Sequence, residues 1–420
     1  MPVSLDLDLV KQKLHAVLEQ IKQLQSSEFP YEEPKAALGL LTEIYKSDLG
    51  RLSKMDATTD IQIRQQACAH ANAHIARYYS VLGFILRSTN VRNAFEMYDP
   101  LLQLCLKIYG GDAKLIISSE WQFSPFTYPA VTDDLPHLMF IGLPSTEASN
   151  PLIIPLAGHE IGHSIWRKKK GRSTALGGLD MKLQQKLVEA YTNNWKDFQR
   201  IFNISNSHAD LLSDLFLRNI WTQSYKLAIR QVEEIFCDLI GLRIFGESFL
   251  YSFIYLIAPN IGDRAPHYPT LAARVSALEA ACASYLVELP PGFTSFFLDP
   301  PKRIPTADEF VLKMADSASE ALTADLIDAV RVHIQSSGLS LPSDAERDRI
   351  IQHFCALSPA SGIKSLGDMI NAGWKVRLDW RLWGAFNFSE QTRLEVLNDL
   401  VFKTMEVLEY ETKTQGVKNA

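Results

Sequence analysis

Apolar residues at spacings of three and four recur along most of this 420-residue chain, and that periodicity restricts it to a mainly helical fold. Only the stretch from Lys114 to Pro144 departs from it. There, KLIISSEWQF and HLMFIGLP are short β-prone runs separated by a loop that contains prolines. We therefore expect an α+β fold that is predominantly α-helical and carries one small sheet.

The chain is too long for one ordinary hydrophobic core, so we expect several lobes. The change of texture near 113 and the prolines between Pro290 and Pro305 mark the boundaries. This predicts an N-terminal helical lobe at 1–112, a central core at 113–290 with a helical insertion at about 172–223, and a C-terminal helical lobe at 291–420.

Composition excludes several classes of protein. A formal net charge of -6 gives no general attraction for nucleic acid or anionic membranes. The five cysteines include no CxxC pair, and the N-terminus lacks the pattern of a signal peptide. The most apolar stretch, Phe249 to Pro259, is about half the length of a bilayer-spanning helix. We expect a cytoplasmic protein with reduced thiols, no transmembrane segment and no nucleic-acid partner.

The sequence His159-Glu160-Ile161-Gly162-His163 is a HExxH pattern within a predicted helix at about 155–170. Histidines four residues apart lie on one helical face, so both imidazoles can reach one Zn²⁺. Glu160 is rotated by about 100° from His159, which suits a carboxylate that meets metal-bound water. We predict His159 and His163 as zinc ligands and Glu160 as the general base.

A catalytic zinc needs a third protein ligand. The pattern HExxHxxGxxH is excluded, because Trp166 and Lys169 stand where it requires glycine and histidine. Downstream, Glu233, Glu234 and Asp238 lie in an otherwise apolar helical run, where carboxylates need a cation. Either glutamate is a candidate on these grounds.

The segment from Glu234 to Asp238 resembles the ExxxD signature of the gluzincin metallopeptidases, a clan that includes the thermolysin-like and Ste24/HtpX-like enzymes. The resemblance implies a gluzincin-like core with Glu234 as third zinc ligand and Asp238 as a hydrogen-bond partner of a ligand histidine. Glu233 is the alternative ligand. Its partner one turn later would be Cys237, a poor group for orienting a histidine.

His267-Tyr268-Pro269, followed by Arg274-Val275, is partly similar to the HPP-x-x-x-R segment of the Ste24/HtpX-like branch. Tyr268 stands where that branch has histidine, and His267 lies one position early. The similarity implies His267 or Tyr268 as a hydrogen-bond donor to the oxyanion, with Arg274 as a further catalytic-site residue. The alternative is an ordinary loop and helix start with surface charge.

Two other groups of residues have plainer interpretations. His70 and His74 repeat the spacing of four, but without an adjacent glutamate or an evident third carboxylate, so we interpret them as a polar helix face. The basic run Arg167, Lys168, Lys169, Lys170 and Arg172 follows the metal helix, and we interpret it as a solvated helix end.

Together these patterns predict a zinc-dependent endopeptidase, a regulated intracellular processing protease that acts on a peptide or protein and can have a regulatory partner. We expect the strands within 115–143 to bind an extended peptide by strand addition. The alternatives are a non-catalytic helical partner-binding protein with a structural or relic zinc site, and a zinc hydrolase acting on a non-peptide amide.

Overall fold

The computed structural model describes residues 5–56, 58–89, 95–121, 125–128, 135, 137–170, 174–258, 265–297, 306–339 and 341–418. The chain forms two compact units. The first comprises residues 1–95 and 112–148, and the second comprises 96–111 and 149–420. As the sequence predicts, the fold is mostly helical with one two-stranded sheet among the described residues.

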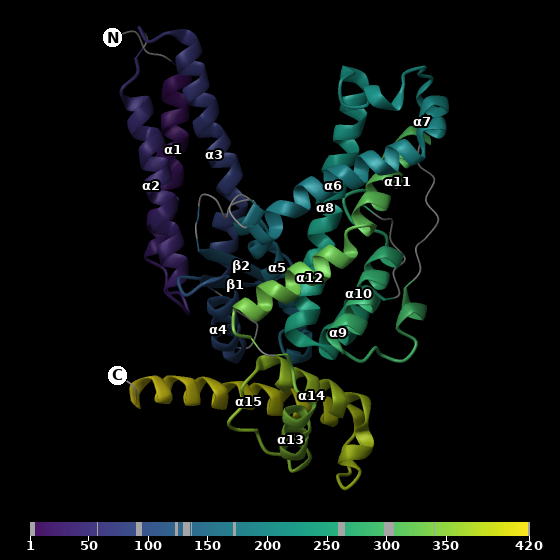
Figure 1. Cartoon of the computed structure of the whole chain (residues 1–420). Coiled ribbons are helices and arrows are strands. Elements are labelled where there is room, and N and C mark those ends of the chain that lie inside the picture. The colour runs from purple at the N-terminus through teal and green to yellow at the C-terminus, as the bar shows by residue number, and fades with distance from the viewer. Residues whose placement is uncertain are drawn as a thin grey trace. The chain divides into compact units, whose positions relative to one another are not determined.

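The first unit is a set of three long helices that pack on one another and on a small sheet (Figure 1). Its elements are α1 (Leu5–Gln25), α2 (Glu33–Ser53), α3 (Ile61–Arg87), β1 (Lys114–Glu120), β2 (Leu138–Pro144) and the 3-10 turn η3 (Ser145–Glu147). The Asp60 carboxylate caps α3 by accepting hydrogen bonds from the backbone N–H groups of Gln62 and Ile63.

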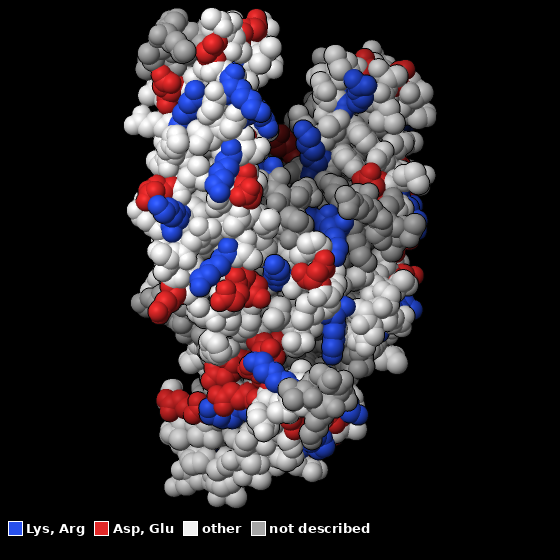
Figure 2. All heavy atoms as spheres, turned by 90° about the vertical axis from the view of Figure 1, so that its left-hand side faces the viewer, with Lys and Arg blue, Asp and Glu red and all other residues white. Residues whose placement is uncertain are grey.

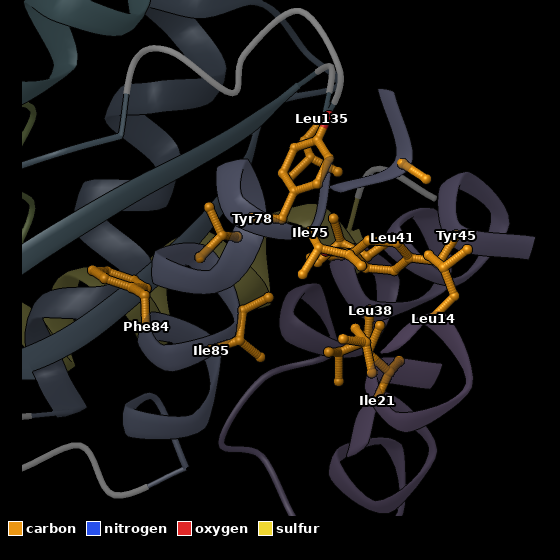
Figure 3. Close-up of a cluster of buried hydrophobic side chains, with 14 of the residues drawn as sticks. Leu14, Ile21, Leu38, Leu41, Tyr45, Ile75, Tyr78, Phe84, Ile85 and Leu135 are labelled. Carbon is orange, nitrogen blue, oxygen red and sulfur yellow. The ribbon is translucent and has the colours of Figure 1, made fainter. Parts of the chain in front are cut away.

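The core of the first unit is formed by side chains from the three helices and from the sheet region (Figure 3). Leu14 of α1, Leu38 of α2 and Phe84 of α3 are each fully buried, and Leu135, which precedes β2, belongs to the same cluster. The apolar spacing of three and four that predicts these helices is therefore the pattern that builds this core.

The two strands are parallel, with Lys114 opposite Leu138 and Glu120 opposite Pro144. Every residue of β2 is buried, as is usual for parallel strands. Gly142 pairs with Ser118 of β1 and also forms an antiparallel bridge to Phe126. A peptide added to β2 as a further strand would have to displace Phe126 at this position.

The second unit is helical among its described residues (Figure 1). Its elements are α4 (Tyr98–Tyr109), η4 (Pro151–Ile153), α5 (Pro155–Lys170), α6 (Thr174–Asn193), α7 (Trp195–Phe202), η5 (His208–Asp210), α8 (Leu215–Phe245), α9 (Glu247–Ile257), α10 (Leu271–Tyr285), η6 (Phe293–Phe296), α11 (Thr306–Glu320), α12 (Thr323–Ser336), α13 (Asp344–Cys355), α14 (Leu366–Leu378), η7 (Trp380–Trp383) and α15 (Glu390–Lys418), with η1 (Phe95–Met97) at the boundary between the units. The long helix α8 is central, since α5, α6, α10, α11 and α12 all pack against it.

These two units differ from the three lobes expected from the sequence. Residues 112–148 group with the N-terminal helices, because Ile116, Leu138 and Phe140 share their hydrophobic core. Residues 291–420 are not a separate lobe, because α11 and α12 pack on α8. The prolines between Pro290 and Pro305 suggest a linker, but composition does not show that the helices after it pack on α8.

The apolar stretch that begins at Phe249 lies on α9 as far as Ile257, and Phe249, Leu250 and Phe253 are buried. In the part of the chain that the structure describes, no helix combines the length and the apolar composition of a membrane span. On the face drawn in Figure 2, Lys and Arg side chains are interspersed with Asp and Glu instead of forming one basic field.

Candidate metal centre

The HExxH segment lies on α5. Glu233, Glu234 and Asp238 lie on α8, which packs directly against α5. Glycines allow this close approach. A Cβ atom on Gly162 would lie 2.8 Å from the Cα of Cys237, and one on Gly158 would lie 3.1 Å from the Cα of Gly241. Because both contacts are with backbone atoms of α8, larger residues would push the helices apart. The two halves of the predicted site meet through this glycine-lined contact.

His159 and His163 stand one turn apart on α5, with ring centroids 5.0 Å apart. The Nδ1 atom of His159 lies 2.8 Å from Asp238 Oδ1, and that of His163 lies 3.2 Å from Glu233 Oε1. A hydrogen bond from each Nδ1–H to its carboxylate leaves each Nε2 as the nitrogen with a free lone pair. This is the arrangement in which a histidine side chain binds a metal.

Glu234 lies opposite these two Nε2 atoms. Its Oε2 is 3.4 Å from His159 Nε2, and its Oε1 is 3.7 Å from His163 Nε2. The Glu234 side chain is about 10% exposed, and the histidines are 13% and 12% exposed, so all three groups are largely withdrawn from water. Glu234 therefore has one oxygen near Nε2 of each histidine, which makes it a candidate third ligand.

Asp238 is held between the site and a buried cation. Arg274, on α10, donates two hydrogen bonds of 2.7 Å from Nε and Nη2 to the two oxygens of Asp238. Burial by itself raises the pKa of Asp238, but Arg274 and His159 outweigh it and lower that pKa to about 2. Asp238 therefore stays ionised and can fix the ring orientation of His159.

The charges favour a cation at the histidine pair. Burial by itself lowers the pKa of His159, but hydrogen bonds to Asp238 and Glu234 reverse the shift and raise the pKa to about 10. The imidazole therefore carries a proton when no other cation is bound. A divalent metal ion would take over the positive charge that the surrounding carboxylates demand.

Glu233 contacts His163 at Nδ1, whereas Glu234 lies near Nε2 of the same ring. Its Oε1 accepts from Arg167 Nε at 3.3 Å, and its Oε2 accepts from Arg230 Nη1 at 2.8 Å. Burial opposes ionisation of Glu233, yet the His163 hydrogen bond and Arg167 lower its pKa overall. With its oxygens engaged at His163 Nδ1 and at two arginines, Glu233 is the poorer third ligand.

The interpretation of the basic run as a solvated helix end is wrong for the partly buried Arg167, whereas Lys168 is exposed. Arg167 binds Glu233, and Lys168 Nζ donates to the carbonyl oxygen of Tyr109 at 2.7 Å. The side chains of Lys169, Lys170 and Arg172 lie outside the described residues. One turn of helix beyond His163 brings Arg167 back to the same face of α5, which periodicity alone could have shown.

Glu160, the predicted general base, is buried with 7% of its surface exposed. Burial raises the pKa of its carboxyl group, His159 and His163 oppose that effect, and Glu234 adds to it. A carboxylate whose pKa is raised toward neutrality is the kind that exchanges protons efficiently near pH 7.

Cys237 is a further potential ligand, because its Sγ and one nitrogen of each histidine lie within 4.8 Å of one another. We favour Glu234 over Cys237 on chemical grounds. Cys237 is fully buried beneath Gly162, and burial raises the pKa of its thiol well above the ordinary value. A thiol must lose its proton to bind a metal, whereas Glu234 is already a carboxylate, with a lowered pKa.

His267, Tyr268 and Arg274, the residues of the partial HPP-x-x-x-R similarity, lie in different surroundings. Burial raises the pKa of Tyr268, and the charges of Glu234 and Glu160 add to the shift, so this phenol lies within the field of the site. Tyr268 is 40% exposed, and the His267 ring packs on it at 4.7 Å. Arg274 is neither a surface charge nor free to contact a substrate, because Asp238 binds its guanidinium.

The donor set fits Zn²⁺. Two neutral imidazole nitrogens and one carboxylate oxygen are ligands that zinc accepts, and three protein ligands leave a coordination position open. Comparison with protein-family models, with curated proteins and with solved structures found no significant match.

Proposed function

We propose that this protein is a zinc-dependent peptidase in which His159, His163 and Glu234 hold the metal. One observation carries the proposal: both Nε2 atoms lie within 3.7 Å of Glu234 oxygens, while both Nδ1 atoms are held by other carboxylates. The resemblance of the ExxxD segment to gluzincins supports the same assignment and suggests a gluzincin-like core.

Zinc at this position would supply a Lewis acid and lower the pKa of water toward about 7. The chain supplies the remaining functions. Glu160 accepts a proton from the attacking water and transfers it to the leaving amine. Asp238 and Glu233 keep the two imidazoles in the tautomer that binds metal, and Arg274 keeps Asp238 ionised.

Tyr268 is the candidate for stabilising the oxyanion of the tetrahedral intermediate. Its phenol combines partial exposure with proximity to the charges of Glu160 and Glu234. A donor of this kind contributes about 3 to 4 kcal/mol to transition-state stabilisation in other hydrolases. We assign His267 a supporting position beside the Tyr268 ring.

The first test is zinc content after dialysis, for the native protein and for His163→Ala and Glu234→Ala. We expect about one zinc ion at this site, lost in both variants. Glu160→Gln should retain that zinc and lose at least 100-fold in the cleavage of a peptide library. Glu309→Gln, an exposed glutamate on α11, is the matched control and should retain both properties.

These outcomes separate the proposal from its rivals. Zinc retained by Glu160→Gln without any cleavage by the native protein would favour a structural zinc site in a partner-binding protein. Cleavage of small amides but not of peptides would favour a different hydrolase. Unaltered zinc content in both ligand variants would rule out this ligand set.

A further inference from the structure

We propose that Asp48, His70 and His74 form a second metal site, for a divalent ion of the zinc class, between α2 and α3 of the first unit. It involves none of the residues on α5 or α8. Each of its three side chains offers one ligand atom, and these atoms all lie within 4.8 Å of one another.

The spacing of four on α3 brings the His70 and His74 rings together, with their centroids 4.2 Å apart and their planes tilted by 59°. The sequence shows no third ligand near this pair. Packing of α2 on α3 provides it, because Asp48 projects to the same place. Its Oδ2 lies 2.6 Å from His74 Nδ1, and its Oδ1 lies 4.0 Å from His70 Nε2.

The buried carboxylate of Asp48 distinguishes this cluster from a pair of surface histidines. Its side chain is 3% exposed, and a carboxylate that is withdrawn from water needs a cation or several hydrogen bonds. Its ion-pair partners among the described residues are His70 and His74.

The donors identify the class of ion. Two imidazole nitrogens with one carboxylate oxygen favour Zn²⁺ and its neighbours Co²⁺, Ni²⁺ and Cu²⁺ over Mg²⁺ or Ca²⁺, which prefer all-oxygen sites. Bonds of about 2.1 Å need ligand atoms about 3.4 Å apart. His70 is 47% exposed and so has room to turn inward and close the site. The bound ion would link α2 to α3.

The test is a competition titration of the full chain with zinc against a chromophoric chelator, which counts tight sites only. The native protein should bind about two zinc ions, and His74→Ala and Asp48→Asn should each bind about one. In the His163→Ala background, His74→Ala should remove the remaining ion. His15→Ala, an exposed histidine on α1, is the control and should leave the count unchanged.

Each outcome decides the matter. One ion in the native protein that His74→Ala leaves in place overturns the second site and is compatible with the α5–α8 site. One ion that His74→Ala removes and His163→Ala leaves supports the second site and counts against the proposed function. Circular dichroism shows whether His74→Ala or Asp48→Asn unfolds the chain. In that case His70→Ala is used in their place, because His70 is half-exposed. An unchanged count in folded His70→Ala overturns the proposal.

Discussion

The two histidines of the HExxH segment contact different carboxylates, which lie on successive turns of α8. Asp238 holds His159 and is itself held by Arg274, whereas Glu233 holds His163 between Arg167 and Arg230. Such partners restrict the tautomer and rotation of a ligand imidazole, which raises metal affinity beyond what the ligands alone provide.

Asp238→Asn is expected to weaken zinc binding at this site by about 10- to 100-fold. Asparagine keeps the shape but loses the charge that fixes the Nδ1–H tautomer and pairs with buried Arg274. The dissociation constant is measured by chelator competition, with Asp344→Asn, an exposed residue of α13, as the control. Unchanged affinity in a folded variant would show that Asp238 does not support the ligand.

At the scale of elements, the site depends on how closely α5 and α8 approach. Gly162 lies inside the HExxH segment, yet neither a ligand nor a base needs glycine at that position. Its Cβ would lie 2.8 Å from backbone Cα of Cys237, so its role is in packing. The distance between the histidines and Glu234 is therefore set by a residue with no chemical function.

Gly162→Ala should destabilise the protein by about 1 to 3 kcal/mol and weaken zinc binding, because the added methyl group pushes α8 away. Gly178→Ala on α6 is the matched control, since a Cβ there meets nothing within 4 Å. That variant should be neutral or stabilised by about 0.5 to 1 kcal/mol. Thermal unfolding and zinc titration measure both effects. Equal behaviour of the two variants would contradict the packing argument.

The junction of α13 and α14 carries a pH-sensitive contact. Asp368 of α14 is buried and accepts a 2.6 Å hydrogen bond from the backbone N–H of Ser343, the N-cap residue of α13. Burial raises the pKa of Asp368 from 3.8 to about 6, although the hydrogen bond opposes this. The folded state therefore binds this proton more tightly than the unfolded state.

Because the folded-state pKa is the higher one, stability from this group is greatest below pH 4 and is lost as the pH rises toward about 6. Asp368→Asn does not titrate, so relative to the native protein it should gain roughly 2 kcal/mol between pH 4 and pH 7. Urea unfolding across this range measures the difference. Asp344→Asn, whose side chain is exposed, should show none. A pH-independent difference for Asp368→Asn would refute the assignment.

At the scale of the whole molecule, the two units have their own cores. The cluster in Figure 3 draws its buried residues only from the first unit, including Leu38 of α2. In the second unit, α8 supplies a continuous buried segment that includes Leu239. Units with separate cores can unfold in separate steps.

Leu38→Ala and Leu239→Ala, both at fully buried positions, should each cost about 2 to 5 kcal/mol but act on different thermal transitions. Differential scanning calorimetry should show one transition lowered by each variant. Removal of zinc from the α5–α8 site should lower the temperature of the same transition that Leu239→Ala lowers. A single transition that both variants shift equally would show that the two units unfold together.

The helical class, the two β-prone runs and the HExxH helix with His159, Glu160 and His163 could be predicted from the amino-acid sequence. Periodicity and motif spacing are local properties of the chain, so they can be recognised without knowledge of the fold. The choice of Glu234 came from a resemblance, since the residues alone left Glu233 open.

The tertiary structure was needed to show which residues lie together although they are far apart in the chain. It joined the strands to the N-terminal helices, gave Glu233 the role of orienting His163, and showed Arg274 bound to Asp238. It also placed Asp48 beside His70 and His74. These contacts depend on how helices pack, and a helical pattern defines which face is buried but not which partner covers it.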